Sequence, residues 1–122
     1  MTNPAKTLLL LNPLEVKPEE YYLDQEKLIS GNPLQTLWMH YTDQSEQFFS
    51  GMWRSEPGKW LIHYTEEEYC CISVGVSVVT DEAGNSTSLK AGDEFIIPKG
   101  FVGTWEVTET TTKRFVMYEK NV

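Results

Sequence analysis

Short runs of apolar and β-branched residues, separated by turn residues, recur along most of the chain. The longest covers residues 69–80 and contains four Val and one Ile, which favour strands. Shorter runs of the same kind cover residues 34–41, 48–53, 60–64, 95–97, 101–107 and 113–118. Residues 81–86 (DEAGNS) predict a hairpin turn between two of these strands. Regularly spaced short strands predict an all-β protein, built as a sandwich or a barrel.

The first 40 residues have a different pattern. Prolines at positions 4, 13 and 18 flank the apolar run at 8–11, which predicts an extended arm over residues 1–20. Residues 19–28 (EEYYLDQEKL) fit either a helical turn or a strand. We expect one domain over residues 1–122, with the arm and first strands in 1–40 and the barrel core in 41–120. Because the arm cannot form its own core and sheet edges need cover, we expect a homodimer.

Composition narrows the classes of partner. The chain has 18 acidic and 10 basic residues, a net charge of −8, and no basic cluster, which argues against a nucleic-acid partner. The apolar run at 8–11 is too short for a signal segment or a membrane span, so no membrane association is expected. Cys70 and Cys71 are neighbours that a strand would turn to opposite faces, so two buried thiols are favoured over a redox pair. This cysteine usage fits a reducing cytoplasm.

Two spacings resemble the sequence motifs of the cupin superfamily. Gly92, Pro98 and Gly100 match the second motif, G-x5-P-x-G-x2-H-x3-N, while Glu68 and Gly75 match the E-x6-G part of the first, G-x5-H-x-H-x3-4-E-x6-G. The runs at 51–60 (GMWRSEPGKW) and 98–106 (PKGFVGTWE) are similar to the Cupin_3 subgroup. That subgroup resembles the ureidoglycine aminohydrolase cupin domain and the ethanolamine-utilisation Q-type cupins. The resemblance covers about residues 40–120 and implies an RmlC-like jelly-roll β-barrel.

The positions where this resemblance places metal ligands are mostly changed. Ile62, Tyr64 and Gly103 stand where histidines would be, and Glu68 alone remains of four usual ligands. His63 lies between two of these positions, and strand alternation is expected to turn it to the opposite face. With the longer spacing of the first motif, His63 would take the second ligand position, but Leu61 would then stand at the first. A metal site needs three or four suitable ligands, so we expect no metal ion and no other cofactor.

Strand alternation predicts which side chains line the barrel. The expected ligand-binding residues are Trp53, Ile62, Tyr64, Glu68, Cys70, Phe95, Gly103 and Trp105, with Tyr118 as a further candidate. Glu68 and Tyr64 are the candidate catalytic residues, with Glu68 as a general acid or base in apolar surroundings. In the alternative interpretation Glu68 is a structural carboxylate whose hydrogen bonds stay within the barrel. Gly103, which has no side chain, is expected to leave open the space that an imidazole would fill.

Three functions remain compatible with these residues. The favoured one is a module that binds a small organic ligand, for instance amine- or carbohydrate-derived, without a metal. The second is an enzyme of small-molecule metabolism (amine, ureide or carbohydrate), either metal-assisted or using Glu68 and Tyr64. The third is a non-catalytic accessory or assembly protein whose barrel is filled. A carboxylate in a narrow apolar cavity favours a cationic or donor-rich ligand.

Overall fold

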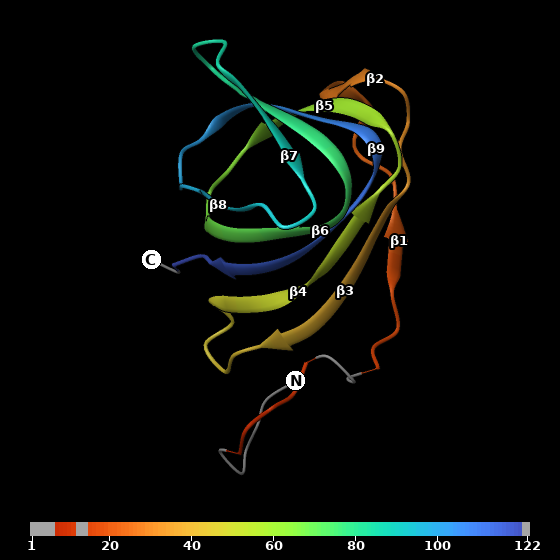
Figure 1. Ribbon diagram of the computed structural model, residues 1–122. Helices are drawn as coiled ribbons and strands as arrows, with labels where there is room; N and C mark the ends of the chain where they lie inside the picture. The colour runs from red at the N-terminus through yellow and green to blue at the C-terminus, as the bar shows by residue number, and fades with distance from the viewer. Residues whose placement is uncertain (1–6, 12–14, 121–122) are drawn as a thin grey trace.

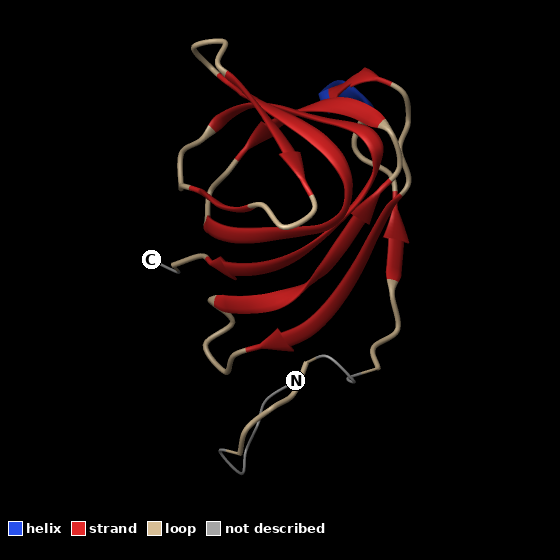
Figure 2. Cartoon of the chain, in the orientation of Figure 1, coloured by secondary structure: helices blue, strands red, loops and turns tan. Residues whose placement is uncertain are grey.

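The expectation of an all-β chain is confirmed by the computed structural model, which describes residues 7–11 and 15–120. Nine strands are present in this part of the chain: β1 (Glu19–Tyr21), β2 (Leu28–Ser30), β3 (Gln35–Thr42), β4 (Phe48–Ser55), β5 (Gly58–His63), β6 (Glu67–Asp81), β7 (Ser86–Lys90), β8 (Glu94–Ile97) and β9 (Val102–Tyr118). Within the same residues the helical structure is a short 3-10 turn, η1 (Gln25–Lys27), next to β2 (Figure 2).

The strands form a single antiparallel sheet that curls into a half-barrel (Figure 1). Along one path the strand order is β1-β3-β4-β9-β5-β2, and β6 pairs with β7, β8 and β9. The first part of β9 lies between β5 and β6, and its second part lies between β4 and β6. This long strand therefore joins β4 and β5, which pair along one of its edges, to β6, which pairs along the other.

A glycine in the middle of β6 lets this strand bend. The register between β6 and β9 shifts on both sides of Gly75, whose φ is 94°. A Cβ at this position would lie 2.1 Å from the carbonyl oxygen of Thr110, so a residue with a side chain would clash with β9. A bulge of this kind increases the local twist, and it allows the 15-residue β6 to turn over the concave face.

The concave face of the sheet holds the hydrophobic core. Its buried residues are Trp53, Trp60, Ile72, Val79, Leu89, Ile97, Trp105, Val107 and Phe115. They come from six of the strands, and buried positions alternate with more exposed ones along β4 and the first part of β9. The core is therefore rich in indole rings, with Trp53 in T-shaped contact with both Trp60 and Trp105.

The strand predictions are mostly confirmed, with three differences. Residues 101–107 and 113–118 were expected as two strands, but they belong to the continuous strand β9. Residues 19–28 contain both of the structures considered, because β1 is followed by η1. Strand β7 was not expected separately. The predicted turn at 81–86 is present, and the carboxylate of Asp81 accepts a 2.9 Å hydrogen bond from the backbone N–H of Asn85.

Only part of the expected N-terminal arm can be described. Residues 7–11 contain no strand and lie outside the sheet (Figure 1). Within them, the side chains of Leu8 and Leu10 are 88% and 64% exposed. Residues 1–6 and 12–14, which include two of the prolines that predicted the arm, lie outside the described residues.

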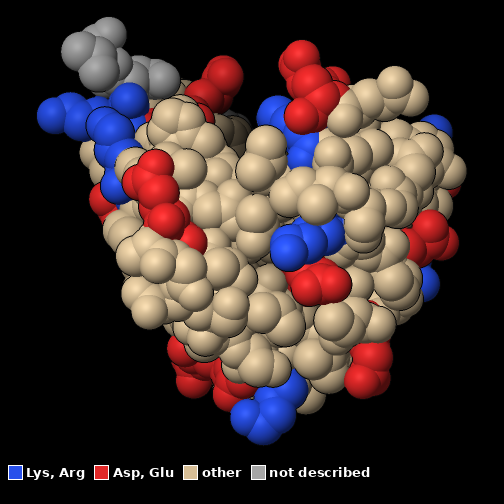
Figure 3. Space-filling view, turned by 90° about the horizontal axis from the view of Figure 1, so that it is seen from above, with Lys and Arg blue, Asp and Glu red and all other residues tan. Residues whose placement is uncertain are grey.

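Acidic and basic side chains are scattered over the face seen in Figure 3, without a continuous basic area on that face. Among residues 7–11 and 15–120, no helix has the length and apolar character needed to cross a membrane.

Candidate functional site

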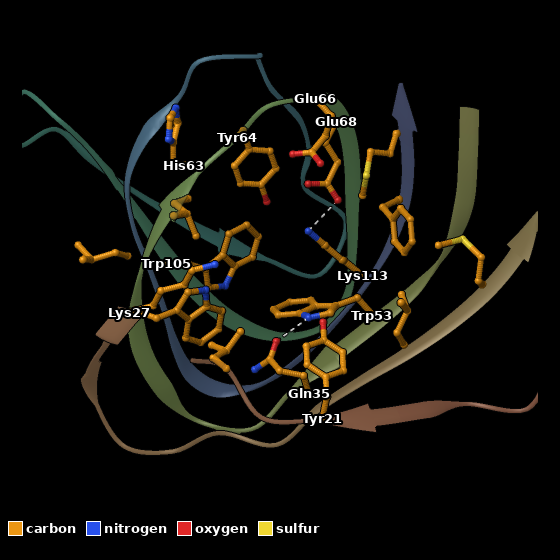
Figure 4. A pocket seen from close by; sticks show the side chains of 18 residues that line it. Tyr21, Lys27, Gln35, Trp53, His63, Tyr64, Glu66, Glu68, Trp105 and Lys113 are labelled. Atoms are coloured by element: carbon orange, nitrogen blue, oxygen red, sulfur yellow. Dashed lines mark hydrogen bonds and ion pairs between the residues drawn. The ribbon is translucent and has the colours of Figure 1, made fainter. Parts of the chain in front are cut away.

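A pocket of about 390 Å³ opens on the concave face of the half-barrel. Strands β1, β3, β4, β5, β6 and β9 and the segments next to them supply its lining: Tyr21, Leu23, Lys27, Gln35, Leu37, Met39, Trp53, Trp60, Leu61, Ile62, His63, Tyr64, Glu66, Glu68, Trp105, Lys113, Phe115 and Met117. Most of these side chains are apolar or aromatic, and a few polar groups lie among them (Figure 4). This composition is typical of pockets that bind small organic molecules.

A buried ion pair lies at the centre of the pocket. The ammonium Nζ of Lys113 is 3.0 Å from Oε2 of Glu68, and the two side chains are only 6% and 3% exposed. Lys113 comes from β9 and Glu68 from β6, so the pair bridges two strands of the half-barrel (Figure 4). Burying one of these charges alone would cost several kcal/mol, which is why each needs the other as a partner.

Two tryptophans also lie close to the ammonium group. Nζ of Lys113 lies 4.8 Å from the ring centroid of Trp53 and 4.6 Å from that of Trp105. Trp53 is the cross-strand neighbour of Lys113 in the register of β4 and β9, which brings its ring beside the lysine. Contacts of this kind between a cation and an indole face are attractive, more so where water is excluded.

Hydrogen bonds to the scaffold fix the orientation of both indole rings. Nε1 of Trp53 donates to Oε1 of Gln35 at 2.7 Å, and Nε2 of Gln35 donates to the hydroxyl of Ser55 at 2.7 Å. Nε1 of Trp105 donates to the hydroxyl of Ser77 at 3.1 Å. Because the indole N–H groups already have partners in the sheet, the ring faces are held in place toward Lys113.

The ionisable groups near this pair are shifted toward their protonated forms. Burial raises the pKa of Tyr64, an effect that Glu68 reinforces and Lys113 opposes. Burial likewise raises the pKa of Cys70 to about 12. Burial lowers the pKa of Lys113, but the carboxylate of Glu68 more than offsets this, and the net direction is upward. At neutral pH the site therefore holds a charged ammonium, a neutral phenol and a neutral thiol.

The structure brings together five of the eight residues that the sequence predicts as ligand-binding. Trp53, Ile62, Tyr64, Glu68 and Trp105 all belong to the pocket lining. The lining does not include Cys70, Phe95 or Gly103. Cys70 is fully buried, and Phe95 packs against Trp105 with ring centroids 6.2 Å apart. The further candidate Tyr118 is 46% exposed.

The expected open space at Gly103 is absent, so that prediction is wrong. A Cβ built on Gly103 would lie 2.0 Å from the carbonyl oxygen of Thr80 on β6. Here β9 runs between β5 and β6, and Gly103 pairs with Ile62 on one side and with Asp81 on the other. The glycine therefore permits a close approach of strands, and it does not vacate a ligand position.

Lys113 is the main residue that the sequence-based prediction missed. It was placed at the start of a separate strand, whose Tyr118 was considered as an inward residue. In the continuous strand β9, Lys113 has the same parity as Trp105 and Val107 and therefore faces the interior with Phe115 and Met117. The alternation at residues 113–117 was the available signal. The ion pair with Lys113 compensates the charge of Glu68 within the half-barrel, which argues against the cationic ligand expected from the sequence.

The residues at this position do not fit a metal ion of the kind that the cupin resemblance implies. Ile62 and Gly103 have no donor atom in their side chains, and the phenol of Tyr64 is held protonated. Glu68, the remaining carboxylate of the motif, is already paired with an ammonium group. Within residues 7–11 and 15–120, no three His, Cys, Asp or Glu side chains are grouped so that they could hold a metal ion.

The chain belongs to the EutQ-like cupin domain family, whose model matches residues 42–115. This confirms the resemblance to Cupin_3 cupins and the cupin fold. No curated protein sequence matches the chain.

Solved structures with the same fold come from several bacteria. A DUF861-family protein of unknown function from Pseudomonas syringae pv. tomato str. DC3000 superposes with a TM-score of 0.78 at 22% identity, over 88% of this chain and 46% of its own. The EutQ protein of Clostridium difficile gives 0.64 at 18% identity, over 73% and 65%. A putative ethanolamine utilization protein Q from Salmonella typhimurium LT2 gives 0.65 at 17% identity, over 88% and 99%. The chain thus spans about half of the first relative and about two thirds of the second, and these similarities show the fold alone.

Proposed function

We propose that this protein binds a small organic molecule inside its half-barrel, without a metal ion. The observation that supports this most is the pocket of about 390 Å³, in which apolar and indole walls surround a buried polar centre. Its volume lies in the range of small-molecule sites, and such sites usually combine apolar walls with a few orienting polar groups. A completely filled barrel, as in an accessory protein without a ligand, would not contain this space.

The polar groups of the pocket, Lys113, Tyr64 and Glu68, favour a ligand with oxygen acceptors. Lys113 offers an ammonium group and Tyr64 a protonated hydroxyl, so both can donate hydrogen bonds to a carbonyl, carboxylate or hydroxyl oxygen. Glu68 can accept a hydrogen bond on an oxygen that the lysine does not use. Because the two charges of the ion pair cancel, an uncharged or zwitterionic polar molecule fits better than a simple cation.

The experiment is a ligand screen with an internal control. A library of small polar metabolites would be tested by tryptophan fluorescence, since Trp53 and Trp105 line the pocket, and hits would be measured by calorimetry. A hit should bind Glu68→Gln at least tenfold more weakly than the wild type, while Glu67→Gln should bind normally because Glu67 is exposed. Equal binding by Glu68→Gln, with circular dichroism showing a folded protein, would place the ligand outside this pocket.

An enzyme that works without metal is a second candidate, and the state of Tyr64 favours it. Burial keeps this phenol protonated beside Glu68 and Lys113, where it could donate a proton or a hydrogen bond to a bound carbonyl group. Tyr64→Phe separates the two functions once a ligand is known. In a binding protein it would change affinity alone, whereas in an enzyme it would abolish turnover and leave most of the affinity.

For the assembly, we propose a homodimer that uses the N-terminal arm. The side chains of Leu8 and Leu10 support this, since most of their surface is exposed in the part of the chain that the structure describes. Light scattering should give twice the chain mass of 14.0 kDa. The variant Leu8→Ser/Leu10→Ser should shift the mass toward the monomer. Val74→Ser, which changes another exposed apolar side chain on β6, should not. A wild-type mass of one chain would refute the proposal.

A further inference from the structure

The surroundings of the Lys113 ammonium group have the chemistry of a cation-binding site. Indole faces of Trp53 and Trp105 lie 4.8 and 4.6 Å from Nζ, and the Glu68 carboxylate lies 3.0 Å away. Aromatic faces combined with a carboxylate are what proteins use to bind organic ammonium ligands. In this half-barrel the ammonium group comes from a side chain of the protein itself, Lys113 on β9.

The scaffold is built so that this cation site is permanent. The hydrogen bonds from Trp53 to Gln35 and from Trp105 to Ser77 hold the two rings independently of the lysine. Glu68 is fixed by β6, which pairs with β8 on one side and β9 on the other. Removing the lysine side chain would therefore leave an indole-lined space that still contains a carboxylate.

We infer that this half-barrel contains a primary-ammonium site that its own Lys113 fills, so that Lys113 determines which ligands the pocket accepts. Lys113 is itself the cation partner of Glu68, and it leaves no room beside that carboxylate for a metal ion or a free amine. The pocket then accepts molecules that present an oxygen acceptor to the ammonium group. This inference names the ligand class for the proposed function and in that respect rests on it, but the site itself can be tested without any natural ligand.

The test is chemical rescue of a truncated lysine. Lys113→Ala keeps Cβ and removes three carbons and the ammonium group, which is the size of n-propylammonium. Isothermal calorimetry and thermal denaturation at pH 7 should show that n-propylammonium binds this variant at least tenfold more tightly than the wild type. n-Propanol, the neutral analogue, should give no comparable stabilisation, because it cannot pair with Glu68.

Two control variants identify the site. Lys113→Ala/Glu68→Gln should lose the n-propylammonium binding, since the carboxylate is gone. Lys90→Ala should never acquire it, because Lys90 is 75% exposed and pairs with Asp93 at the surface. The inference is overturned if n-propanol and n-propylammonium act equally, or if the wild type binds the amine as tightly as the variant.

A second measurement covers the case in which Lys113→Ala does not fold. In the wild type at pH 7, nitrogen-15 NMR should resolve one lysine ammonium group whose protons exchange with water at least tenfold more slowly than those of Lys90. If every lysine ammonium exchanges at the same fast rate, Lys113 is not enclosed and the inference fails. A screen that finds no metabolite for the wild type would count against the proposed function, while the rescue result would still decide the ammonium site.

Discussion

Breaking the buried ion pair should destabilise the protein far more than breaking an exposed one. In Lys113→Met the side chain keeps nearly its length but loses its charge, and Glu68 remains buried without a counterion. Loss of one partner of a buried pair costs about 3–5 kcal/mol. Lost contacts between the cation and two indole rings add to this cost. For a chain of this size, that corresponds to a fall in Tm of roughly 10–20 °C.

The assay is a double-mutant cycle measured by urea denaturation at pH 7. Glu68→Gln alone should also be destabilising, because it leaves the ammonium of Lys113 without a charged partner. In Glu68→Gln/Lys113→Met both charges are gone, and the loss should be smaller than the sum of the two single losses by about 2–3 kcal/mol. Lys90→Met is the matched control for a solvent-exposed pair, and it should change stability by less than about 1 kcal/mol.

The cycle can refute the interpretation of this site in two ways. If the single losses simply add, the two side chains do not interact and the pair is not a unit. If Lys113→Met costs no more than Lys90→Met, the lysine is not buried in solution. Either result would also remove the basis for the ammonium site.

Three further predictions use other features of the site. Gly103→Ala should lose at least about 2 kcal/mol, measured by denaturation, because its Cβ would meet the backbone of β6. Burial raises the pKa of Cys70 to about 12, so at pH 8 its thiol should not react with iodoacetamide in the native protein but should react in urea, as measured by mass spectrometry. Labelling of Cys70 in the native protein would contradict this. Folding raises the pKa values of Lys113 and Tyr64, so both groups contribute to folding stability at neutral pH. This contribution is lost as the pH rises above about 10, where the urea midpoint should fall. An unchanged midpoint there would refute the shifts.

The sequence predicts most strands because their apolar alternation and turn residues are local signals. The turn at 81–86 is an example, since the hydrogen bond from Asn85 to Asp81 depends on residues four positions apart. The division of β9 into two strands was wrong for a related reason. Residues 108–112 (TETTT) are polar, and a local pattern cannot reveal that β4 and β6 pair with them from distant parts of the chain.

The site was less predictable than the fold, because partners there meet across the sheet. Trp53 and Glu68 could be placed inward from alternation within their own strands. That Lys113 lies between them depends on the register of β9 against β4 and β6, which no short segment specifies. The error at Gly103 has the same origin, because the missing side chain makes room for Thr80 of a neighbouring strand.

The central position of β9 has a consequence for how the chain folds. Its partners β4, β5 and β6 all precede it in the sequence, and Trp53 pairs with Lys113 across about half of the chain. Contacts this far apart carry a large loop-closure entropy, so the half-barrel should fold slowly for its size. Before residues 102–118 add to the sheet, β4, β5 and β6 are not paired with one another, and Glu68 has no ammonium partner. The pocket is therefore expected to be among the last parts of the protein to form.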